Sequence, residues 1–595
     1  MGDASSQAPA GQRLPEYGDL VIAYLEQLGV EYVFGIPGGA IEPFYNALAR
    51  SERRGGPRAI VARHETGAAF MADGYARNTG RLGVCCATTG PGATNLITGV
   101  ASAYENHIPM LVITAQTPLS TFGRGALQES SCTGVNTVEL FHYCTRYSTL
   151  VSHVEQFEHK LITAIMTAFS SPMGPSHISV PMDVMRSPYA YPAPSYSLPK
   201  LLDKPALFDQ EAVERLYQEL TETEAPVFLI GDEAGEAIGL ILTLAIRLGA
   251  MLIVTPHGKG LVSPFHPLFR GVIGFSGHSS AQQLLTDPRV DRIFVIGANL
   301  GEWASNGWDR RLFSRRLIHI ESTEANLAKT PMAAFHVRGR IKTIFEQVLA
   351  KFEKGATNVS EFGGGKAYTY GDKEKNCRHF TLDDEKGYDS DQAPIKPQRL
   401  MRDLPSIFPP NTHYLADSGN SFSWAIHYLH PYDRRMSGQR DGRRGLFQVA
   451  MEFASMGWAI GSAVGVALAC PGDPVVCLVG DGSMLMAGQE ITVALQEKLP
   501  VIFVVLNDSA YGMVRHGQKL TGSEGIGYQL PHVDFAAFAE SMGIPGYLIR
   551  SPVDLQELVP LKLSERKGPS LLDVRIDCEE VPPIGLRTRI LKDGQ

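Results

Sequence analysis

An α/β fold, in which mostly parallel sheets are flanked by helices, is predicted for this chain of 595 residues. Short runs of Val, Ile, Leu and Cys, such as LGVCCATT and PVVCLV, alternate repeatedly with longer Ala-rich stretches. This rhythm is typical of parallel strands joined by covering helices. The composition agrees with a globular protein, because 44% of the residues are hydrophobic and 19% are charged. Disorder over most of the chain is therefore excluded.

The charge balance argues against nucleic acid as a main partner. The chain has 54 Lys and Arg against 62 Asp and Glu, which gives a net charge of −8, whereas proteins that bind phosphate backbones carry a basic excess. The longest apolar run, residues 458–470, is broken by Gly and Ser and is shorter than the roughly 18 residues of a membrane span. We therefore expect neither a nucleic-acid partner nor a membrane span.

The cysteines indicate a reducing compartment. Eight are present and none forms a CxxC pair, so the sequence suggests neither a zinc ribbon nor a disulfide framework. The N-terminal stretch has no apolar core of the kind that export signals carry. We expect a cytoplasmic protein.

The chain separates into three α/β blocks and one polar segment. The first block covers about 15–190 and ends in a Pro-rich stretch, the second covers about 205–350, and the third covers about 397–580. The segment 353–396 is rich in Gly and Asp and has no sustained apolar period, so we interpret it as a linker or mobile loop.

A similar local pattern occurs in the first and third blocks. LGVCCATT is followed by Gly90-Pro91-Gly92, a helix-like stretch and the strand-like MLVITA. PVVCLV is followed by Gly480-Asp481-Gly482, a helix-like stretch and the strand-like VIFVVLN. The repetition favours two related sheets with a ligand between their strand ends. The alternative is that such units are common in any α/β protein.

The segment Gly480-Asp481-Gly482-Ser483 combines a tight turn with an acidic side chain. It follows a buried strand and opens a helix, so its backbone N–H groups can face an anion such as phosphate. The next strand ends in Asn507-Asp508, which supplies further oxygen ligands of the kind that Mg²⁺ prefers. Used alone, Asp-Gly is more often only a turn. The chain has no Walker GK[ST] after these glycines and no GxSxG, which disfavours a P-loop NTPase and an α/β-hydrolase.

In the first block, Arg63-His64-Glu65-Thr66-Gly67 precedes an Ala-rich helix. An acid in the first turn of a helix is usually a favourable partner of the helix dipole. For His64 we favour a structural role at the helix start over direct catalysis.

Together these segments resemble thiamine diphosphate-dependent enzymes, and among them the acetohydroxyacid synthase-like branch. The resemblance runs from about Tyr17 to Cys578 and is carried by FGIPGGAIEPFYNAL, RHETGAAFMADGYAR, TTGPGATNLITGVASAYENHIPMLVITAQ and GDGSMLMAGQEITVALQEKLPVIFVVLNDSAYGMV. It implies bound thiamine diphosphate with Mg²⁺. It also implies an N-terminal pyrimidine-binding domain, a middle domain and a C-terminal diphosphate-binding domain.

The resemblance assigns roles to individual residues. Glu65 matches the acid that hydrogen-bonds the aminopyrimidine ring and starts proton removal from the cofactor. Met456 matches the apolar wedge under the bent cofactor, with the Ala454 carbonyl as acceptor. Asp481, Asp508 and the Ala510 carbonyl match the metal ligands. The remaining cofactor contacts implied by the matching motifs are Pro91, Asn95, Ser418, Gly419, Asn420, Ser421, Gly482, Ser483, Gly512 and Met513.

Two positions depart from the family's pattern. Asp508 stands where Asn is usual, although Asp remains a competent magnesium ligand, and Asn507 is the substitute ligand if the register shifts by one. The Asn420-Ser421 pair replaces the usual Gln-His, which weakens this part of the assignment.

The resemblance also implies the reaction. Gly39 and Gln128 match residues that face the reacting carbon in the synthases, and the adjacent His-His pair of pyruvate decarboxylases is absent. We expect a carboligase that decarboxylates a 2-oxo acid, with pyruvate as donor, and joins the remainder to a carbonyl acceptor. The alternatives are a 2-oxo acid decarboxylase, a lyase or a hydrolase on the same scaffold, or a regulatory protein that keeps the fold without catalysis.

Three further expectations concern partners and the pocket. The family's sites combine two subunits, so we expect a homodimer or homotetramer. FAD is not expected, because residues 299–303 read NLGEW where flavin-binding synthases carry Arg-Phe-Asp-Asp-Arg. Gly517 stands where these synthases carry a Trp, which leaves room for a bulky acceptor, unless a neighbouring side chain fills the space.

Overall fold

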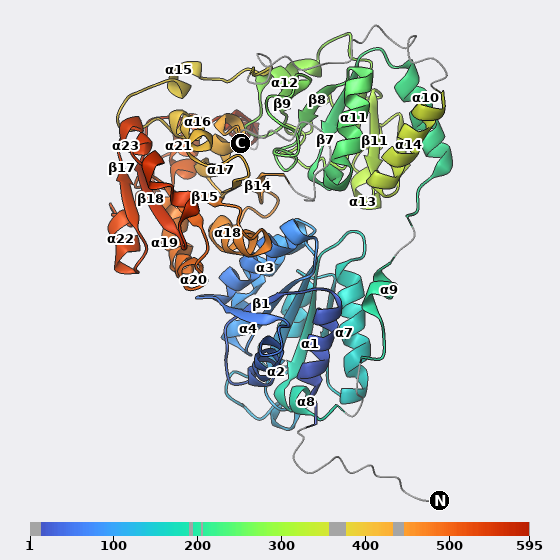
Figure 1. Cartoon of the computed structure of the whole chain (residues 1–595), viewed down its shortest axis with the longest axis vertical. Helices are drawn as coiled ribbons and strands as arrows, with labels where there is room; N and C mark the ends of the chain where they lie inside the picture. Colours follow the sequence, from blue (N-terminus) through green and yellow to red (C-terminus); the bar gives the residue numbers. More distant parts are fainter. Residues whose placement is uncertain (1–13, 190–193, 204–205, 356–376, 432–444, 594–595) are drawn as a thin grey trace, which may run out of the picture. The chain divides into compact units, whose positions relative to one another are not determined.

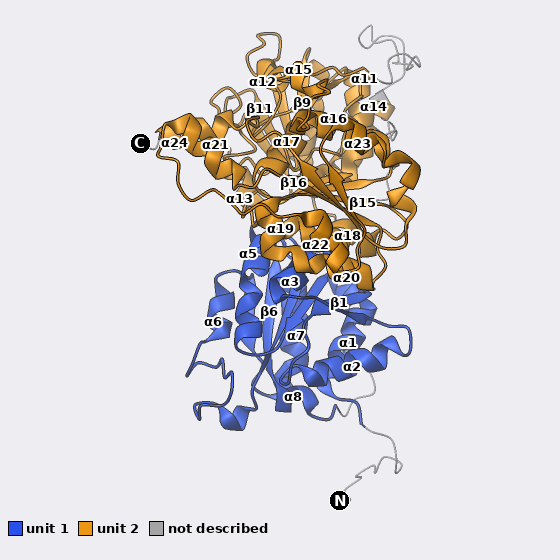
Figure 2. Cartoon of the chain, turned by 90° about the vertical axis from the view of Figure 1, so that its left-hand side faces the viewer, with its two compact units in different colours: residues 1–76, 81–204 blue, residues 77–80, 205–595 orange. Residues whose placement is uncertain are grey.

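The chain forms three parallel sheets, seen in Figure 1 with helices around them. The computed structural model describes residues 14–189, 194–203, 206–355, 377–431 and 445–593. These residues divide into two compact units, coloured separately in Figure 2: residues 1–76 and 81–204 form unit 1, and residues 77–80 and 205–595 form unit 2. The predicted α/β class is confirmed.

Unit 1 contains a sheet of six parallel strands within its described residues, in the order β2-β1-β3-β4-β6-β5. Its strands are β1 (Tyr32–Gly35), β2 (Arg58–Val61), β3 (Gly83–Ala87), β4 (Met110–Gln116), β5 (Tyr147–Leu150) and β6 (Pro175–Pro181). Its helices are α1 (Tyr17–Gln27), α2 (Glu42–Glu52), α3 (Glu65–Thr79), α4 (Pro91–Asn95), α5 (Ile97–Glu105), α6 (Thr137–His142), α7 (Val154–Ala168), α8 (Met182–Arg186) and α9 (Leu198–Leu202). Every residue of β3, β4 and β6 is buried. This explains the apolar runs of β3 and of most of β4, whereas β6 also buries polar Ser and His side chains.

The first sheet of unit 2 belongs to the predicted middle domain. Its described strands follow the order β12-β11-β10-β7-β8-β9. They are β7 (Pro226–Ile230), β8 (Met251–Val254), β9 (Phe269–Val272), β10 (Arg292–Ile296), β11 (Leu317–Glu321) and β12 (Phe335–Arg338). The accompanying helices are α10 (Gln210–Glu222), α11 (Ile238–Leu248), α12 (Ser279–Leu284), α13 (Glu324–Leu327) and α14 (Ile341–Gly355).

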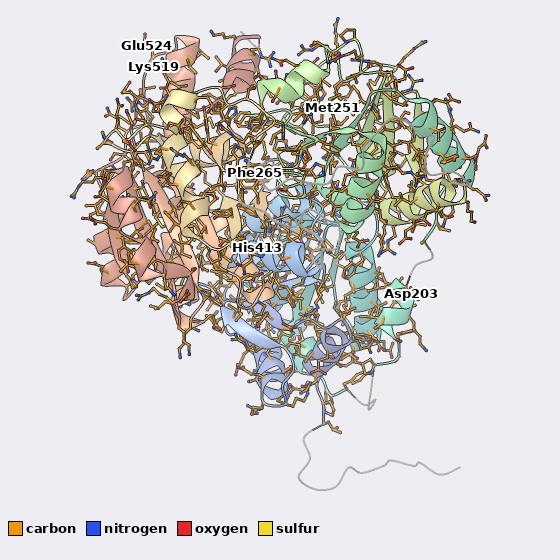
Figure 3. The ribbon with its side chains drawn as sticks, turned by 45° about the horizontal axis from the view of Figure 1, so that its top comes forward. Asp203, Met251, Phe265, His413, Lys519 and Glu524 are labelled. Atoms are coloured by element: carbon orange, nitrogen blue, oxygen red, sulfur yellow. The ribbon has the colours of Figure 1, made fainter. Side chains whose placement is uncertain are left out.

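The second sheet of unit 2 lies in the third predicted block, with the described strands in the order β14-β13-β15-β16-β18-β17. They are β13 (His413–Ala416), β14 (Phe447–Val449), β15 (Val475–Gly480), β16 (Val501–Asn507), β17 (Gly546–Ile549) and β18 (Ser570–Arg575). The helices are α15 (Glu385–Tyr388), α16 (Pro397–Ile407), α17 (Asn420–Tyr428), α18 (Trp458–Ala469), α19 (Asp481–Ala487), α20 (Ile491–Gln496), α21 (Gly512–Thr521), α22 (Phe535–Ser541), α23 (Pro552–Gln556) and α24 (Gly585–Asp593). Figure 3 labels Met251 and His413, which begin β8 and β13.

The sheet of unit 1 and the second sheet of unit 2 have the same strand order. Numbered along each block, both run 2-1-3-4-6-5. The prediction of two related sheets is thereby confirmed, and the repeated turn occupies the same place in each, directly after the third strand of its block. The placement of a ligand between them stays a prediction.

One apolar core joins the two sheets of unit 2. The cluster includes Phe228 and Phe275 from the middle block and Phe422 and Trp424 from the third. The rings of Phe275 and Phe422 are stacked with centroids 5.4 Å apart. Because this core is continuous, the two blocks form one compact unit, and the predicted boundary between them stays a prediction.

The predicted linker 353–396 is packed where it is described. Residues 356–376 lie outside the described residues, while α14 runs on to Gly355. Phe380, Leu382 and Ile395 are buried, and Ile395 forms a parallel bridge with Ile576. The described part is thus not a free linker, because a few apolar side chains, too sparse to give a period, attach it to the core.

Candidate active site

A cavity of about 310 Å³ lies at the carboxyl ends of β13, β15 and β16. The sheet order reverses between β13 and β15, since the chain goes from β13 to β14 on one side and returns to β15 on the other. In open parallel sheets, ligands bind at such a reversal. The cavity is lined by Trp303, Ser418, Gly419, Asn420, Ser421, Phe422, Ala454, Met456, Gly480, Asp481, Gly482, Ser483, Leu506, Asp508, Ala510, Tyr511, Gly512, Met513, Val514, Ile576 and Arg587. All the cofactor and metal positions that the sequence predicts in the third block therefore line one cavity.

Two carboxylates, Asp481 buried and Asp508 partly buried, define the polar end of this cavity. Burial raises the pKa of Asp481 to about 6. Burial and the neighbouring charge of Asp481 raise the pKa of Asp508 to about 7. Two acidic groups held together away from water suit a divalent cation, which compensates both charges.

The backbone fixes these carboxylates in place. Asp481 begins α19, and its Oδ1 accepts from the Gly482 N–H at 2.7 Å. Its Oδ2 accepts from the Ala510 N–H at 3.1 Å, which brings the Ala510 peptide beside it. Ser509, between Asp508 and Ala510, has φ of +55°, a left-handed conformation that costs about 1 to 2 kcal/mol. The oxygen-rich donor set fits Mg²⁺.

Gly512 is needed for close packing at the start of α21. A Cβ at this position would lie 2.4 Å from Asn420 Nδ2 and 2.8 Å from Asp508 Oδ2. Any side chain here would therefore displace the second carboxylate. Asn420 Oδ1 is buried without a hydrogen-bond partner among the described residues, so this amide has bonding capacity left for a ligand.

The loop before α18 carries the predicted wedge. Met456 is 36% exposed, and its Cε lies 3.4 Å from the Cβ position of Gly482. Ala454 has φ of +52°, and it lines the same cavity. Met456 thus lines the cavity next to the glycine turn. An apolar side chain in this place agrees with the predicted wedge, which would contact a bound ring system.

Asp417 holds this loop, and the sequence prediction missed it. The side chain is fully buried and accepts from the Gly457 and Ala459 N–H groups, each at 2.8 Å. Burial raises its pKa to about 6. Its position directly before Ser418, at the end of a strand, is the sequence signal that could have indicated it.

In unit 1, the predicted residues follow the ends of β1, β2, β3 and β4. Glu65 begins α3, is 8% exposed, and its Oε2 accepts from Asn95 Nδ2 at 3.0 Å. The structure thus brings the predicted acid and Asn95 together, with Asn95 orienting the carboxylate. His64 Nδ1 accepts from the Thr66 N–H at 3.2 Å, which agrees with the structural role favoured for it.

The other predicted residues of unit 1 lie around the repeated glycine turn. Pro91 begins α4, after Gly90 with φ of +65°. A Cβ on Gly90 would lie 2.9 Å from Gln128 Cβ, so Gln128 approaches this turn. Gln128 itself has φ of +60°, and its carbonyl accepts from Thr89 Oγ1 at 2.9 Å. Gly39 has open space where its Cβ would be.

Gly517 lies outside the lining of the 310 Å³ cavity. It is buried in α21 and faces α24, where Arg587 Nε and Leu591 Cδ1 are each 4.0 Å from its Cβ position. Neighbouring side chains thus approach the position, as the second of the two sequence interpretations expects. The contact with α24 could not be read from the sequence, because 70 residues separate Gly517 from Arg587.

Replacing Gly517 should separate these two interpretations. Gly517→Trp should lower the free energy of unfolding by about 1 to 3 kcal/mol, since an indole overpacks the contact with α24. Gly517→Ala should raise it by about 0.5 to 1 kcal/mol, because a methyl group fits and Ala favours a helix. Denaturant unfolding measures both. Unchanged stability of Gly517→Trp with selective loss of bulky acceptors would restore the pocket interpretation.

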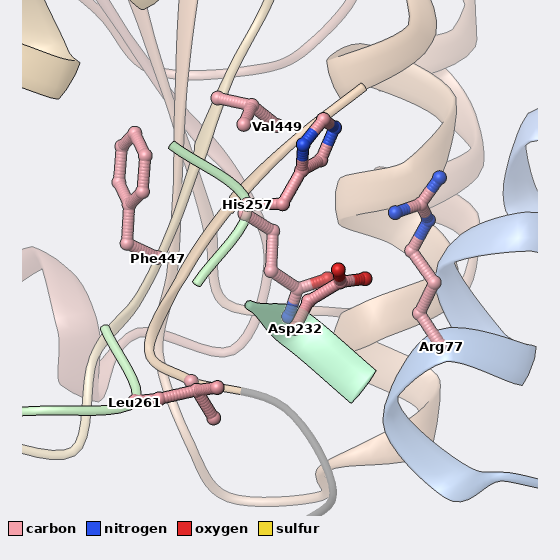
Figure 4. A pocket seen from close by; sticks show the side chains of 8 residues that line it. Arg77, Asp232, His257, Leu261, Phe447 and Val449 are labelled. Carbon is pink, nitrogen blue, oxygen red and sulfur yellow. The ribbon is translucent and has the colours of Figure 1, made fainter. Parts of the chain in front are cut away.

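A second cavity is too small for a substrate. It has a volume of about 10 Å³, and Asp232, His257, Leu261, Phe447 and Val449 are among its lining residues (Figure 4). This is about the space of one water molecule.

The described residues show no helix long and apolar enough to cross a membrane.

The eight cysteines are all unpaired, as the sequence suggested.

Three segments of the chain match the domains of one enzyme family. Residues 15–135 match the N-terminal TPP binding domain of thiamine pyrophosphate enzymes. Residues 213–348 match their central domain, and residues 417–574 match their C-terminal TPP binding domain. The chain belongs to the thiamine pyrophosphate enzyme family, so the predicted resemblance is confirmed.

Within this family the chain is similar to acetolactate synthases. It is 30% identical to the probable acetolactate synthase large subunit of Methanocaldococcus jannaschii, over 96% of this chain and 95% of that protein. It is 29% identical to the acetolactate synthase large subunit of Haemophilus influenzae, over 96% of each chain. It is 28% identical to the acetolactate synthase isozyme 1 large subunit of Escherichia coli, over 99% of this chain and all of that protein.

Proposed function

We propose that this chain is a thiamine diphosphate-dependent carboligase. It decarboxylates a 2-oxo acid, with pyruvate as donor, and joins the remaining carbons to a carbonyl acceptor. The observation that carries the proposal is the cavity in which Asp481, Asp508 and Met456 meet, in a chain similar over its length to acetolactate synthases.

The residues present fit the cofactor. Asp481, Asp508 and the Ala510 carbonyl would hold Mg²⁺ and thereby the diphosphate, with Gly482, Ser483 and residues 418–421 around it. Met456 and the Ala454 carbonyl would hold the ring system. When bound, thiamine diphosphate supplies the electron sink that makes loss of carbon dioxide possible.

Side chains of the protein itself would orient the bound groups and hold the proton that the reaction moves. Glu65 would hold a proton at the cofactor's pyrimidine ring, with Asn95 fixing the direction of the carboxylate. Gly39 and Gln128 would face the reacting carbon. The apolar part of the cavity, formed by side chains such as Phe422, Val514 and Ile576, would exclude water from the reaction.

Product analysis tests this proposal. Purified protein with thiamine diphosphate, Mg²⁺ and pyruvate should release carbon dioxide and form acetolactate, and an added bulky aldehyde or 2-oxo acid should give a mixed product seen by mass spectrometry. Free acetaldehyde as the only product would make the chain a decarboxylase. No release of carbon dioxide from any 2-oxo acid would reject the proposal.

We further propose a homodimer or homotetramer, because the resemblance implies that each site takes residues from two chains. Mixing inactive Glu65→Gln and Asp481→Ala chains should then restore part of the activity through hybrid sites. Mass spectrometry under native conditions can verify that subunits have exchanged. Activity that stays absent after exchange would indicate that each chain builds its own site.

The absence of FAD also stays a prediction. It rests on the NLGEW sequence after β10, in which Trp303 lines the cavity. The purified protein should be colourless, and its visible spectrum should lack stoichiometric flavin absorbance. A yellow protein with one flavin per chain would show the prediction to be wrong.

We also propose that the protein is located in the cytoplasm. Eight unpaired cysteines, four of them buried, suit a reducing compartment. Fractionation of the producing cell, followed by detection of the chain, tests the location.

A further inference from the structure

Arg587 brings a positive charge to the wall of the cavity. It lies on α24 and lines the cavity. Its Nε is buried and has no hydrogen-bond partner among the described residues. Arg515 and Arg575, in contrast, are paired: Arg515 Nη1 donates to the Cys578 carbonyl at 3.1 Å, and Arg575 Nη2 donates to Asp573 Oδ2 at 2.8 Å. Because Arg587 lines the cavity and this donor has no partner among the described residues, the guanidinium is available to a ligand.

Contacts with the middle block hold α24 in position. Arg589 Nη2 donates to Asn306 Oδ1 at 3.1 Å. Leu586 Cδ1 lies 3.0 Å from the Cβ position of Gly307. These two contacts flank Arg587 on the helix, so its side chain is presented to the cavity by an anchored backbone.

The polar end of the cavity is some distance from this guanidinium. The Cβ position of Gly512, at the start of α21, lies 2.8 Å from Asp508 Oδ2, whereas the Cβ position of Gly517 on the same helix lies 4.0 Å from Arg587 Nε. The two glycines are five residues apart, which corresponds to about 7 to 8 Å along a helix. The metal ligands and Arg587 thus serve different parts of one cavity.

The surroundings of Arg587 favour an anionic ligand. Trp303, Val514 and Ile576 contribute apolar surface to the same cavity. Burial lowers the pKa of Arg587, although an arginine remains charged at neutral pH. A carboxylate placed here would accept two parallel N–H bonds and compensate the charge, which is the geometry that a guanidinium provides.

We propose that Arg587 binds the carboxylate of the 2-oxo acid substrate and so selects charged over neutral carbonyl compounds. This inference rests on the proposed function, because it takes the cavity to be the place of reaction. The cofactor's diphosphate offers similar oxygen chemistry. The carboxylate is favoured since Asp481 and Asp508, with their metal ion, already provide for the diphosphate at the other end.

The test uses holoenzyme with thiamine diphosphate and Mg²⁺. Oxamate, an analogue of pyruvate that keeps the carboxylate, is titrated by calorimetry, and oxamide is its neutral counterpart. Arg587→Gln should weaken oxamate binding and raise the KM for pyruvate by roughly 10- to 100-fold, the loss expected for charge-assisted hydrogen bonds. Arg587→Lys should recover part of both. Oxamide binding and thiamine diphosphate affinity should change less than about twofold.

Lys592→Gln is the matched control on the same helix. It removes an exposed positive charge while leaving Arg587 and the contacts that hold α24 in place, so oxamate binding should stay near that of the unchanged protein. Equal weakening in Arg587→Gln and Lys592→Gln would show a general effect of charge on this helix and overturn the inference.

The remaining outcomes separate a failure of this inference from a failure of the proposed function. Unchanged oxamate binding in Arg587→Gln, or a loss of thiamine diphosphate affinity in its place, would overturn the inference while pyruvate turnover by the unchanged protein still supports the proposed function. Conversely, Arg587-dependent oxamate binding in a protein that releases no carbon dioxide from 2-oxo acids would reject the proposed function and keep the carboxylate site.

Discussion

Glu65→Gln should lower kcat by about 10²- to 10⁴-fold, the range of general acid-base catalysis, while the fold is retained. Glu65 is buried, and its Oε2 accepts from Asn95 Nδ2. A glutamine can still accept this hydrogen bond through its carbonyl oxygen, so the start of α3 keeps its contact. The amide cannot take up and return a proton, so only that part of the role is removed.

Three measurements separate the chemical effect from a structural one. Circular dichroism and thermal unfolding should match the unchanged protein, and exchange of the bound cofactor's C2 proton for deuterium should slow together with turnover. Glu42→Gln is the control, since this exposed acid in the first turn of α2 pairs only with Arg186 at the surface among its described ion pairs. Normal proton exchange in Glu65→Gln would show that Glu65 is not the activating acid.

The fold could be predicted because its signals are local and repeated. β3, β15 and β16 are buried along almost all of their length, so each appears as an apolar run followed by a turn. The glycine turns after β3 and β15 mark where the strands end. Strand order could not be read in this way, because it depends on which buried faces pack together across long stretches of chain.

The candidate site likewise contains residues that local sequence patterns could predict and residues that they could not. Asp481 and Asp508 follow directly after strands, so their positions were predictable from parallel-sheet geometry. Trp303 and Arg587 reach the cavity from segments far from those strands in sequence, and no local pattern connects them. At Gly517, both sequence interpretations stay open, and the approach of Arg587 and Leu591 from α24 could not be read from the sequence.

Asp481→Ala should weaken the binding of Mg²⁺ and thiamine diphosphate by on the order of 100-fold or more, given that even residues supporting a ligand are worth 10- to 100-fold. The substitution removes a charged oxygen ligand and the acceptor of the Gly482 and Ala510 N–H groups. It also removes the neighbouring charge that raises the pKa of Asp508. The loss of this repulsion offsets part of the cost of the two lost hydrogen bonds, so the metal-free protein should remain folded and the main loss should be in binding.

Calorimetric titration of the metal-free protein with Mg²⁺ and thiamine diphosphate measures this loss, and prior chelation should release cofactor from the unchanged protein. Asp508→Asn is the informative comparison, because an amide oxygen is still a magnesium ligand and the repulsion between the two acids is gone. It should bind at least ten times more tightly than Asp481→Ala, a difference of about 1.4 kcal/mol. If Asp481→Ala binds both ligands as the unchanged protein does, the diphosphate must be held elsewhere in the cavity and the assignment of Asp481 fails.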